Sequence, residues 1–500
     1  MQGDVEDTGM KRRPVLRALA VLVAAAAVAT AAPSLAAPTL HTASTAKVAV
    51  LHREGRWLVD QSGRVVLLHG VNAVWKRAPY VPPATAAGFT AKDADWMAAQ
   101  GFNTVRLGVI FAGVMPQRGR VDPAYLDKIA RVVDLLAARH IWVLLDFHQD
   151  MYNERFGGEG FPAWAVHDDG IPTPYDAGFP GNYFQPSTTR AFDNFYANVD
   201  GLEDLYAKAW GAVAERFKST SYVVGYDLLN EPWPGSQFAT CANPAGCPVF
   251  DQTALMPLYD KATTAIRRSD PQRVVWVEPH AIFNDGAQTN LGPFTDKQIG
   301  LSFHQYCTTA AFTHSSGGKR GPDCEPQGEL VFDNADSFAA SAGTTDLLTE
   351  FGASDDLPDL ARVTASADKH LVGWQYWQYK EWADPTTESG ASGGQGMFRN
   401  DADLSTLKQD KADLLVRPFA RAVAGIPVSM AFDPASRTFT LAYDAKPASG
   451  LTEVVLPHRH YPRGYRVQVS GATVVSAPGA PVLLLRAGGA GRVTVTVTRR

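Results

Sequence analysis

The chain has 500 residues, of which 45% are hydrophobic and 19% are charged, and its formal net charge is -5. A chain of this length usually folds into more than one domain, and its composition is that of a globular protein rather than a disordered one. The small negative charge provides no basic surface for nucleic-acid phosphates, so we expect no nucleic-acid partner.

Residues 1–37 have the layout of a secretory signal peptide. Basic residues between positions 11 and 17 precede an apolar run of 15 residues over 18–32, and small residues follow up to Ala37. This order of charge, apolar core and small residues is typical of a cleaved export signal. The apolar run is shorter than the roughly 20 residues that span a bilayer as a helix, which disfavours a retained anchor. We expect cleavage near Ala36 or Ala37 and secretion of the mature chain.

Strand-like and helix-like segments alternate over most of the chain. Between residues 125 and 136 apolar side chains recur at helical spacing, and this predicts a helix that ends near Arg139 and His140. The predicted strands are 65–70, 104–108, 142–147, 223–229, 274–277, 300–304, 347–351 and 372–377. Eight such units, with no glycine-rich nucleotide-binding loop, favour an α/β fold of the (β/α)8 TIM-barrel type over an open sheet. We assign residues 38–417 to this catalytic domain, with its longest insertion from Gln149 to about Val199.

The pattern changes after Pro418. Short β-rich runs lie at 439–443, 453–456, 465–469, 481–485 and 493–497, and Gly, Pro and Ser separate them. They predict a small C-terminal antiparallel β-sandwich over residues 418–500. Few titratable side chains converge there, so we expect no chemistry in this domain.

Four cysteines suggest disulfides in an exported chain. Their positions favour Cys241 with Cys247 and Cys307 with Cys324, one of three possible pairings. A metal site is the alternative, but neither pair has CxxC spacing and no histidine cluster lies beside them.

Two glutamates stand at predicted strand ends. Asn230-Glu231-Pro232 closes the fourth strand and Glu350 closes the seventh. Barrel enzymes place their catalytic groups at the carboxyl ends of the strands, so these two carboxylates can converge. Cleavage of a glycosidic bond by a retaining enzyme needs such a pair, about 5 to 5.5 Å apart. Asn230 is placed to hydrogen-bond a sugar 2-hydroxyl.

Several further motifs occur in the order that glycoside hydrolase family 5 shows, and the chain resembles that family. The motifs are Arg106, Asp146-Phe147-His148, Asn230-Glu231-Pro232, His304-Gln305-Tyr306, Glu350 and Trp377. The resemblance implies that Glu231 is the general acid/base and Glu350 the nucleophile. It also implies that Arg106 and Tyr306 hydrogen-bond Glu350, that His148 and His304 line the subsite at the scissile bond, and that Trp377 forms its apolar floor.

These implied roles agree with elementary chemistry. An arginine beside a carboxylate favours the charged form, so we expect Arg106 to keep Glu350 ionised. The alternative for His148, His304 and Trp377 is a satisfied core residue, which their positions at strand ends disfavour. Trp382 is a further candidate for sugar binding, and its role stays open.

Finer features resemble the endoglycoceramidase branch of the family. They are the segments 68–72, 146–152 and 157–165, although Phe161 stands where a small residue is expected. This resemblance implies a retaining endo-β-glycosidase that cuts between the oligosaccharide and ceramide of a glycosphingolipid. Lys76, Asp146 and Gln149 are candidates to hydrogen-bond the sugar. Lys76 has the alternative of a solvated loop charge, and Asp146 that of an internal partner of His148.

Other readings remain open at this point. The aromatic side chains between Tyr175 and Phe195 either line an apolar groove for the lipid or pack the long insertion onto the barrel. Another β-glycanase or glucosidase, cellulase-like or glucosylceramidase-like, and a non-catalytic carbohydrate- or lipid-binding protein are the alternative functions. The two-carboxylate mechanism needs no cofactor and no metal. We expect a monomer that binds a glycolipid or oligosaccharide, with transient contact to a membrane or micelle.

Overall fold

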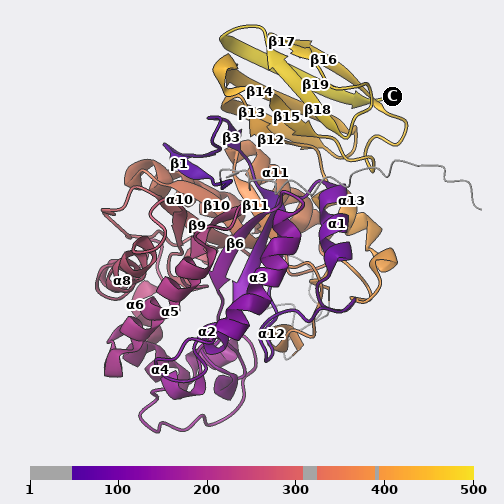
Figure 1. Ribbon diagram of the computed structural model, residues 1–500. Helices are drawn as coiled ribbons and strands as arrows, with labels where there is room; N and C mark the ends of the chain where they lie inside the picture. Colours follow the sequence, from indigo (N-terminus) through magenta and orange to yellow (C-terminus); the bar gives the residue numbers. More distant parts are fainter. Residues whose placement is uncertain (1–47, 308–323, 389–393) are drawn as a thin grey trace, which may run out of the picture. The chain divides into compact units, whose positions relative to one another are not determined.

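A computed structural model describes residues 48–307, 324–388 and 394–500. Within these ranges eight parallel strands close into a barrel. Each strand pairs with the next along the chain, and the last strand pairs with the first. Helices such as α3, α5 and α8 lie outside the strands (Figure 1). The (β/α)8 barrel predicted from the alternating pattern is therefore confirmed.

The barrel strands begin close to their predicted positions, with one exception discussed below. They are β4 (His69–Ala73), β5 (Thr104–Val109), β6 (Trp142–Phe147), β7 (Val223–Asp227), β8 (Val274–Val277), β9 (Ile299–Gln305), β10 (Thr345–Phe351) and β11 (Gly373–Tyr376). The longer helices are α1 (Ala91–Gln100), α3 (Pro123–Ala137), α4 (Pro186–Tyr196), α5 (Leu202–Phe217), α8 (Met256–Arg267), α10 (Cys324–Ala342), α11 (Leu357–His370) and α13 (Gln409–Leu415). Short helices are α2 (Phe111–Val114), α6 (Phe238–Cys241), α7 (Pro248–Phe250) and α12 (Pro385–Glu388).

Helix α3 shows why the helical prediction succeeded. Asp122 caps its first turn by accepting a hydrogen bond from the Ala124 amide, and Pro123 occupies the first helical position. The side chains at the predicted spacing, from Tyr125 to Leu136, are buried against the barrel. The stripe of apolar residues and the cap thus define both the face and the start of the helix.

The prediction for the first barrel strand is wrong in position. We expected residues 65–70, whereas the barrel strand β4 covers His69–Ala73. Residues Val65–Val66 form β3, which pairs antiparallel with β12 (Phe419–Val423) outside the barrel. The apolar run Val65–Leu68 continues into His69 and Gly70 without a Pro or Asn turn signal, so tertiary pairing is what separates the two strands.

The C-terminal strands form two antiparallel sheets with one shared hydrophobic core. Alternating burial along β14 and β19 turns Phe439, Leu441 and Val495 inward, as expected for a sandwich. The four-stranded sheet contains β13 (Gly425–Asp433), β14 (Thr438–Ala445), β19 (Gly491–Arg499) and β16 (Tyr465–Ser470). The other contains β1 (His52–Glu54), β2 (Trp57–Val59), β3, β12, β15 (Thr452–Val455), β18 (Val482–Ala487) and β17 (Ala472–Val474). Strands that precede the barrel therefore complete a sheet that we had assigned to residues 418–500 alone.

A buried histidine joins the barrel to these sheets. The His69 ring stacks on Trp374 of β11 at 4.4 Å and on Phe419 of β12 at 4.0 Å between ring centroids. Neither ring nitrogen has a hydrogen-bond partner among the described residues. Burial, together with the charge of Arg417, lowers the pKa of His69 well below its ordinary value. The ring is therefore neutral in the folded protein.

This histidine predicts an acid-sensitive junction. Because the folded-state pKa is lowered, His69 contributes stability above its unfolded pKa of about 6.5 and loses it as the pH falls, at about 1.4 kcal/mol per pH unit. The variant His69→Phe cannot titrate at this position. We therefore expect its melting temperature to fall less between pH 7.5 and pH 5 than that of the wild type. Differential scanning calorimetry at the two pH values measures this, and an equal loss in both proteins would contradict it.

The long insertion after β6 is packed rather than open. Tyr183, Phe192 and Phe195 are buried, and Phe161 stacks on Tyr152 with ring centroids 4.0 Å apart. Phe161 thus belongs to the core and not to the rim of a sugar cleft. Of the two readings of the aromatic segment, packing accounts for most of its rings.

The cysteines pair as predicted, Cys241 with Cys247 and Cys307 with Cys324. The first disulfide closes a short loop beyond β7, and the second joins the segment after β9 to the start of α10. Both therefore anchor loops at the catalytic end of the barrel strands.

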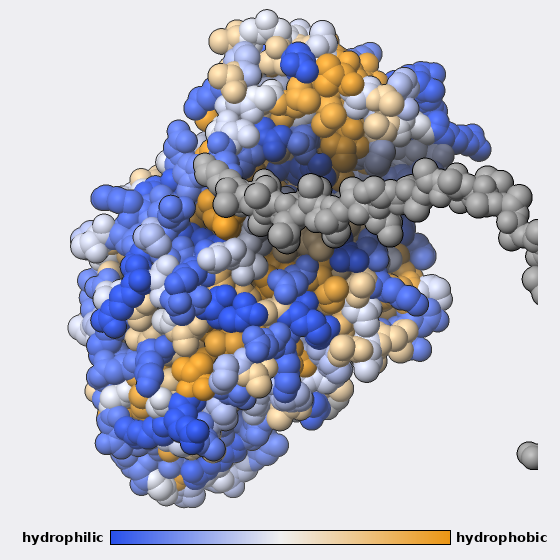
Figure 2. Space-filling view, in the orientation of Figure 1, coloured by the Kyte–Doolittle hydropathy of each residue, from blue (hydrophilic) through white to orange (hydrophobic). Residues whose placement is uncertain are grey.

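Few large apolar side chains are exposed in the described ranges. Hydrophilic residues cover much of the visible barrel face, with hydrophobic residues in scattered areas (Figure 2). Tyr175, at 66%, and Phe184, at 50%, are exposed on the insertion after β6. No helix of the described residues has the length and apolar character needed to cross a membrane.

Candidate active site

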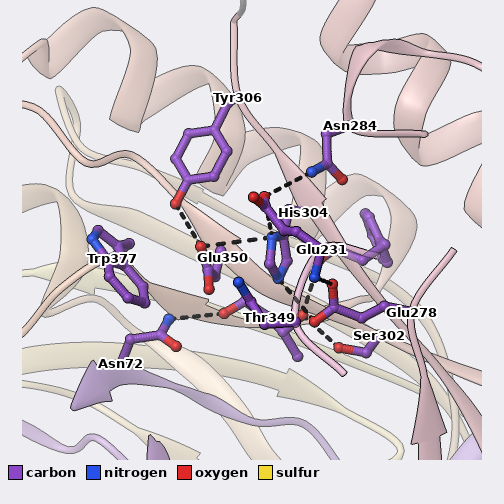
Figure 3. Close-up of polar contacts among 12 residues, drawn as sticks. Asn72, Glu231, Glu278, Asn284, Ser302, His304, Tyr306, Thr349, Glu350 and Trp377 are labelled. Carbon is purple, nitrogen blue, oxygen red and sulfur yellow. Dashed lines mark hydrogen bonds and ion pairs between the residues drawn. The ribbon is translucent and has the colours of Figure 1, made fainter. Parts of the chain in front are cut away.

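The two glutamates come together at the carboxyl ends of the barrel strands, as Figure 3 shows. Glu350 lies on β10 and Glu231 follows β7. One carboxylate oxygen of each lies within 4.8 Å of the other, and His304 Nδ1 lies 2.8 Å from Glu231 and 3.6 Å from Glu350. This close approach agrees with the spacing of about 5 to 5.5 Å in retaining glycosidases better than with the 6.5 to 9.5 Å of inverting ones.

Arg106, on β5, is the electrostatic centre of the site. Its guanidinium is fully buried and forms ion pairs of 2.5 Å with Glu350, 2.8 Å with Glu278, 2.9 Å with Asp227 and 3.0 Å with Asp146. A buried arginine is stable only when its donors meet acceptors, and four carboxylates supply them. Arg106 thus fixes the nucleophile in place, as the resemblance implied.

The environment of Glu350 balances burial against positive charge. Burial raises its pKa above the ordinary value, and the charges of His304, Arg106 and His148 oppose this without reversing it. Tyr306 donates a hydrogen bond of 2.9 Å to Glu350 Oε2, and such a bond favours the ionised form. Our expectation that Arg106 determines the ionisation of Glu350 is thus incomplete, because desolvation is the larger effect.

Glu231 is the more accessible carboxylate, with 17% of its side chain exposed. Its Oε1 accepts a hydrogen bond of 2.9 Å from Asn284 Nδ2 and lies 2.8 Å from His304 Nδ1. Its backbone has a φ of 42°, a left-handed conformation that is uncommon outside glycine. An exposed edge and a fixed orientation suit a group that exchanges protons with substrate and water.

Trp377 forms an apolar surface beside the nucleophile (Figure 3). The His148 ring stacks on it with centroids 5.0 Å apart, and Lys76 Nζ lies 4.6 Å from the ring centre. Lys76 is not a solvated loop charge, because only 3% of its side chain is exposed and it pairs with Asp150 at 2.5 Å. A pyranose ring can stack on such an indole surface.

Four predicted substrate-binding side chains have their polar groups turned inward. Asp146 is fully buried between His148 and Arg106, which confirms it as an internal partner of His148, and its contact with sugar stays a prediction. Gln149 donates to the Asn230 and Glu231 carbonyls. Asn230 accepts from Arg106 and donates to the Gln149 carbonyl, and Trp382 donates to the Ala87 carbonyl. The contacts of Gln149 and Asn230 therefore hold the backbone at Glu231 and the Arg106 guanidinium in place.

The glycine-rich segment 157–160 packs against residues 149 and 150 at the end of β6. Asp150 and Glu159 exchange backbone hydrogen bonds of 3.0 and 2.9 Å. A side chain at Gly158 would place its Cβ 1.7 Å from the Asp150 carbonyl, and one at Gly160 would lie 2.4 Å from Gln149 Cβ. Only glycine permits this close approach, which presses the segment onto the end of β6.

Sequence reasoning missed several residues of the site. Glu278 directly follows β8, and its position at a strand end was a signal that we did not use. Asn284 lies in the short 3-10 helix Ala281–Asp285 and Asp227 inside β7, where no local pattern distinguishes them from ordinary polar residues. Asn72 of β4 accepts from Arg106 and donates to the Thr349 carbonyl.

Two groups of side chains have the composition of a metal site. They are His148 with Asp150 and Glu159, and His304 with Glu231 and Glu350, each with one atom per residue within 4.8 Å. In the first group the Lys76 ammonium already neutralises Asp150. The second consists of the carboxylates that glycoside cleavage itself requires. We therefore assign a metal to neither.

The site predicts how activity depends on pH. The nucleophile must be ionised, and burial raises the pKa of Glu350, so activity declines on the acid side at a higher pH than an ordinary glutamate gives. Tyr306→Phe removes a hydrogen bond to the ionised form. We expect it to move the acid limb of kcat/KM to higher pH and to lower kcat/KM at neutral pH by roughly 10- to 100-fold. A variant whose acid limb does not move would contradict this assignment.

Comparison with known proteins agrees with this geometry. Residues 59–382 match the family model described as cellulase (glycosyl hydrolase family 5), and residues 417–498 match the glycoside hydrolase family 5 C-terminal domain. Endoglycoceramidase I of Rhodococcus hoagii (strain 103S) is 38% identical over 90% of this chain and 89% of its own length. An endoglycoceramidase of Cyanea nozakii is 29% identical over 83% of this chain and 86% of its own.

Solved structures show the same fold. Endo-glycoceramidase II from Rhodococcus sp., in a five-membered iminocyclitol complex, has a TM-score of 0.74 and 32% identity, covering 89% of this chain and 99% of its own. The same enzyme has been solved as a ganglioside GM3 complex, with a TM-score of 0.74 and 30% identity over 89% of this chain and 100% of its own. A lactosyl-enzyme intermediate, with a TM-score of 0.72 and 30% identity, covers 89% of this chain and 99% of its own.

Proposed function

The chain belongs to glycoside hydrolase family 5, and from this premise we propose that it is a retaining endo-β-glycosidase which separates the oligosaccharide of a glycosphingolipid from its ceramide. The observation that carries the proposal is the pair Glu231 and Glu350, with carboxylate oxygens within 4.8 Å. This distance suits direct attack by one carboxylate and leaves no room for the water of an inverting mechanism.

The proposed reaction has two steps. In the first, Glu350 attacks the anomeric carbon while Glu231 gives its proton to the departing ceramide oxygen, so the glycosidic bond breaks and a glycosyl ester forms. In the second, Glu231 takes a proton from water, which displaces Glu350 and releases the oligosaccharide. Arg106 and Tyr306 hold Glu350 through both steps.

Two supports favour a glycolipid over a polysaccharide. The relatives that cover most of this chain are endoglycoceramidases, and a neighbouring structure is a ganglioside complex. The chain also has a cluster of three aromatic side chains, which we call the aromatic ledge: Phe184, Trp233 and Phe238. Trp233 lies two residues after Glu231 in the sequence. Trp233 stacks on Phe238 at 4.8 Å, and Phe184 meets both rings at 4.9 Å while half exposed. Because Glu231 protonates the leaving group, we place the lipid against this ledge.

Product analysis tests the substrate. Purified protein is incubated with detergent-dispersed glycolipids of the ganglio, globo and gala series, and with a soluble β-glucan, alongside Glu350→Gln. Mass spectrometry should find intact ceramide and the complete oligosaccharide with the wild type only. Single sugars with a glycosylceramide remainder would indicate an exo-acting enzyme. Cleavage of the β-glucan alone would favour the cellulase-like alternative.

A paired variant tests the ledge. Phe184→Ala should raise KM for the glycolipid while leaving hydrolysis of a small aryl glycoside of the same glycan unchanged. Tyr175→Ala removes another exposed ring of the same insertion and is the matched control, expected to alter neither. Equal effects of the two variants on KM for the glycolipid would place the lipid elsewhere.

We also propose that the chain is exported after cleavage near Ala36 or Ala37, and that the mature protein is a monomer. The basic residues and apolar run before residue 37 support the first statement. N-terminal sequencing of protein recovered from culture medium, and light scattering after size exclusion, test the two statements. Binding to lipid vesicles under the same conditions tests the expected transient membrane contact.

A further inference from the structure

A further glutamate, which is buried, lies beside the catalytic pair. Glu278 directly follows β8 and is 2% exposed (Figure 3). Its backbone carbonyl accepts a hydrogen bond of 2.6 Å from the Tyr259 hydroxyl, which fixes the main chain at this point. The reaction proposed above makes no use of this carboxylate, so its burial at the catalytic centre calls for a role.

Two hydrogen bonds and one longer ion-pair contact converge on the two oxygens of Glu278. Arg106 Nη2 donates to Oε1 at 2.8 Å, and His304 Nε2 lies 3.3 Å from the same oxygen. The backbone amide of Glu231 donates to Oε2 at 2.8 Å. An ionised carboxylate only accepts hydrogen bonds, so it suits all three groups at once. Each of them belongs to a residue that contacts or carries the catalytic carboxylates.

The bond to the Glu231 amide acts on the acid/base directly. Glu231 has a φ of 42°, in a region that residues other than glycine adopt rarely. Such a conformation persists only where the surroundings hold it. Glu278 is a fixed acceptor for the hydrogen bond of this amide. It therefore helps to hold the Glu231 backbone in the conformation that directs the carboxylate toward the nucleophile.

Glu278 also faces the ring of His304. Nε2 lies 3.3 Å from Glu278 Oε1, while Nδ1 lies 2.8 Å from Glu231 Oε1 and 3.6 Å from Glu350 Oε2. Burial opposes the charged form of His304, but the charges of Glu278 and Glu350 raise its pKa well above the ordinary value. Glu278 thereby helps to keep a charged ring whose Nδ1 faces the acid/base.

We propose that Glu278 is a positioning residue for acid catalysis, which holds the Glu231 backbone and the His304 ring through one carboxylate. The inference rests on the proposed function and deepens it. It predicts that loss of Glu278 impairs proton delivery to the leaving group more than attack by the nucleophile.

The charged and titratable groups around this unit come from several strands. Glu278 itself faces Arg106 of β5 and His304 of β9, with Tyr259 of α8 behind it. His304 faces Glu231 after β7 and Glu350 of β10 as well. A pH profile must therefore be interpreted against all of these groups and compared with a control variant.

Glu278→Gln is the sharpest substitution, because it keeps the shape and replaces one acceptor oxygen with a donor NH2. The NH2 group of the new side chain must then face either the Glu231 amide or the Arg106 and His304 nitrogens, all of which are themselves donors. With a phenyl glycoside, whose leaving group needs a proton, we expect kcat/KM to fall about 100-fold. With a 2,4-dinitrophenyl glycoside of the same glycan, the first step needs no acid. We therefore expect the rate of the dinitrophenol burst to fall less than about 5-fold. The basic limb of the phenyl glycoside profile should also move.

Asp227→Asn is the matched control. Asp227 pairs with Arg106 Nε at 2.9 Å and accepts from Ser302, and within the described ranges it forms no hydrogen bond or ion pair with Glu231 or His304. We expect this control to affect both aryl glycosides alike and to leave the ratio between them at the wild-type value. Labelling of Glu350 by a 2-fluoro dinitrophenyl glycoside, followed by intact mass measurement, shows that each variant is folded and has a competent nucleophile.

The outcomes separate this inference from the proposed substrate. Equal losses of Glu278→Gln on both aryl glycosides, with an unchanged basic limb, would overturn the positioning role. A Glu278→Gln protein that cannot be labelled would shift the comparison to Glu278→Asp, for which the same unequal losses are required. A wild type that cleaves aryl glycosides but no glycolipid would overturn the substrate alone, because the two aryl glycosides still test Glu278.

Discussion

Glu350→Gln is expected to lower kcat by at least about four orders of magnitude on every substrate, because it removes the group that forms the glycosyl ester. Glutamine keeps the shape and the volume of the side chain. It leaves the Arg106 guanidinium without its partner of 2.5 Å, so some loss of stability should accompany the loss of activity. Steady-state hydrolysis and thermal melting of the same preparation measure the two effects.

A smaller variant and a small anion distinguish this role from simple disruption. In Glu350→Gly, azide can enter the vacated space and displace the leaving group of an activated aryl glycoside from the opposite face. The product should be a glycosyl azide of inverted configuration, identified by nuclear magnetic resonance. A β-configured azide, or hydrolysis by Glu350→Gln near the wild-type rate, would show that another group is the nucleophile.

Glu231→Ala should affect substrates according to their leaving groups. General acid catalysis contributes about 10²- to 10⁴-fold, so glycolipid and phenyl glycoside cleavage should fall by that factor. A 2,4-dinitrophenyl glycoside should still release one equivalent of phenol rapidly. Slow turnover then follows, since the second step lacks its base. Stopped-flow absorbance at about 400 nm, where dinitrophenolate absorbs, records the burst.

Azide again provides the control for Glu231→Ala. It needs no base, so it should attack the glycosyl ester and restore turnover with a β-glycosyl azide as product. A uniform loss on all leaving groups without azide rescue would remove Glu231 from the acid/base role. The variant Glu278→Gln should resemble a weakened Glu231→Ala in its dependence on the leaving group.

Much of the fold followed from local patterns. The stripe of apolar residues in 125–136 predicted helix α3, and apolar β-rich runs predicted the barrel strands with small errors at their ends. The strand β4 was misplaced because residues 65–70 form one apolar run shared by two sheets. Period and composition report which side of an element is buried, but not which neighbour buries it.

For the site, position at a strand end was the useful signal. It identified Glu231, Glu350, His304 and Trp377, all of which the structure brings together. It gave no information on direction, so it could not show that the polar atoms of Asp146 and Gln149, both candidates for sugar binding, contact Arg106, His148 and the backbone. The side on which a polar group finds its partner depends on residues far away in the chain.

The sequence by itself determined the barrel and the C-terminal β-rich region, favoured the disulfide pairing that the structure shows and placed two glutamates at strand ends, because each leaves a local mark in spacing, composition or position. Only the tertiary structure decided that four carboxylates share Arg106, that Glu278 holds the Glu231 backbone, and that β1 to β3 complete a C-terminal sheet. These features join residues far apart in the sequence, such as Arg106 with Glu350 and Val65 with Val423, and the charged ones depend on the balance of burial and charge. Such a balance exists only once the chain has folded.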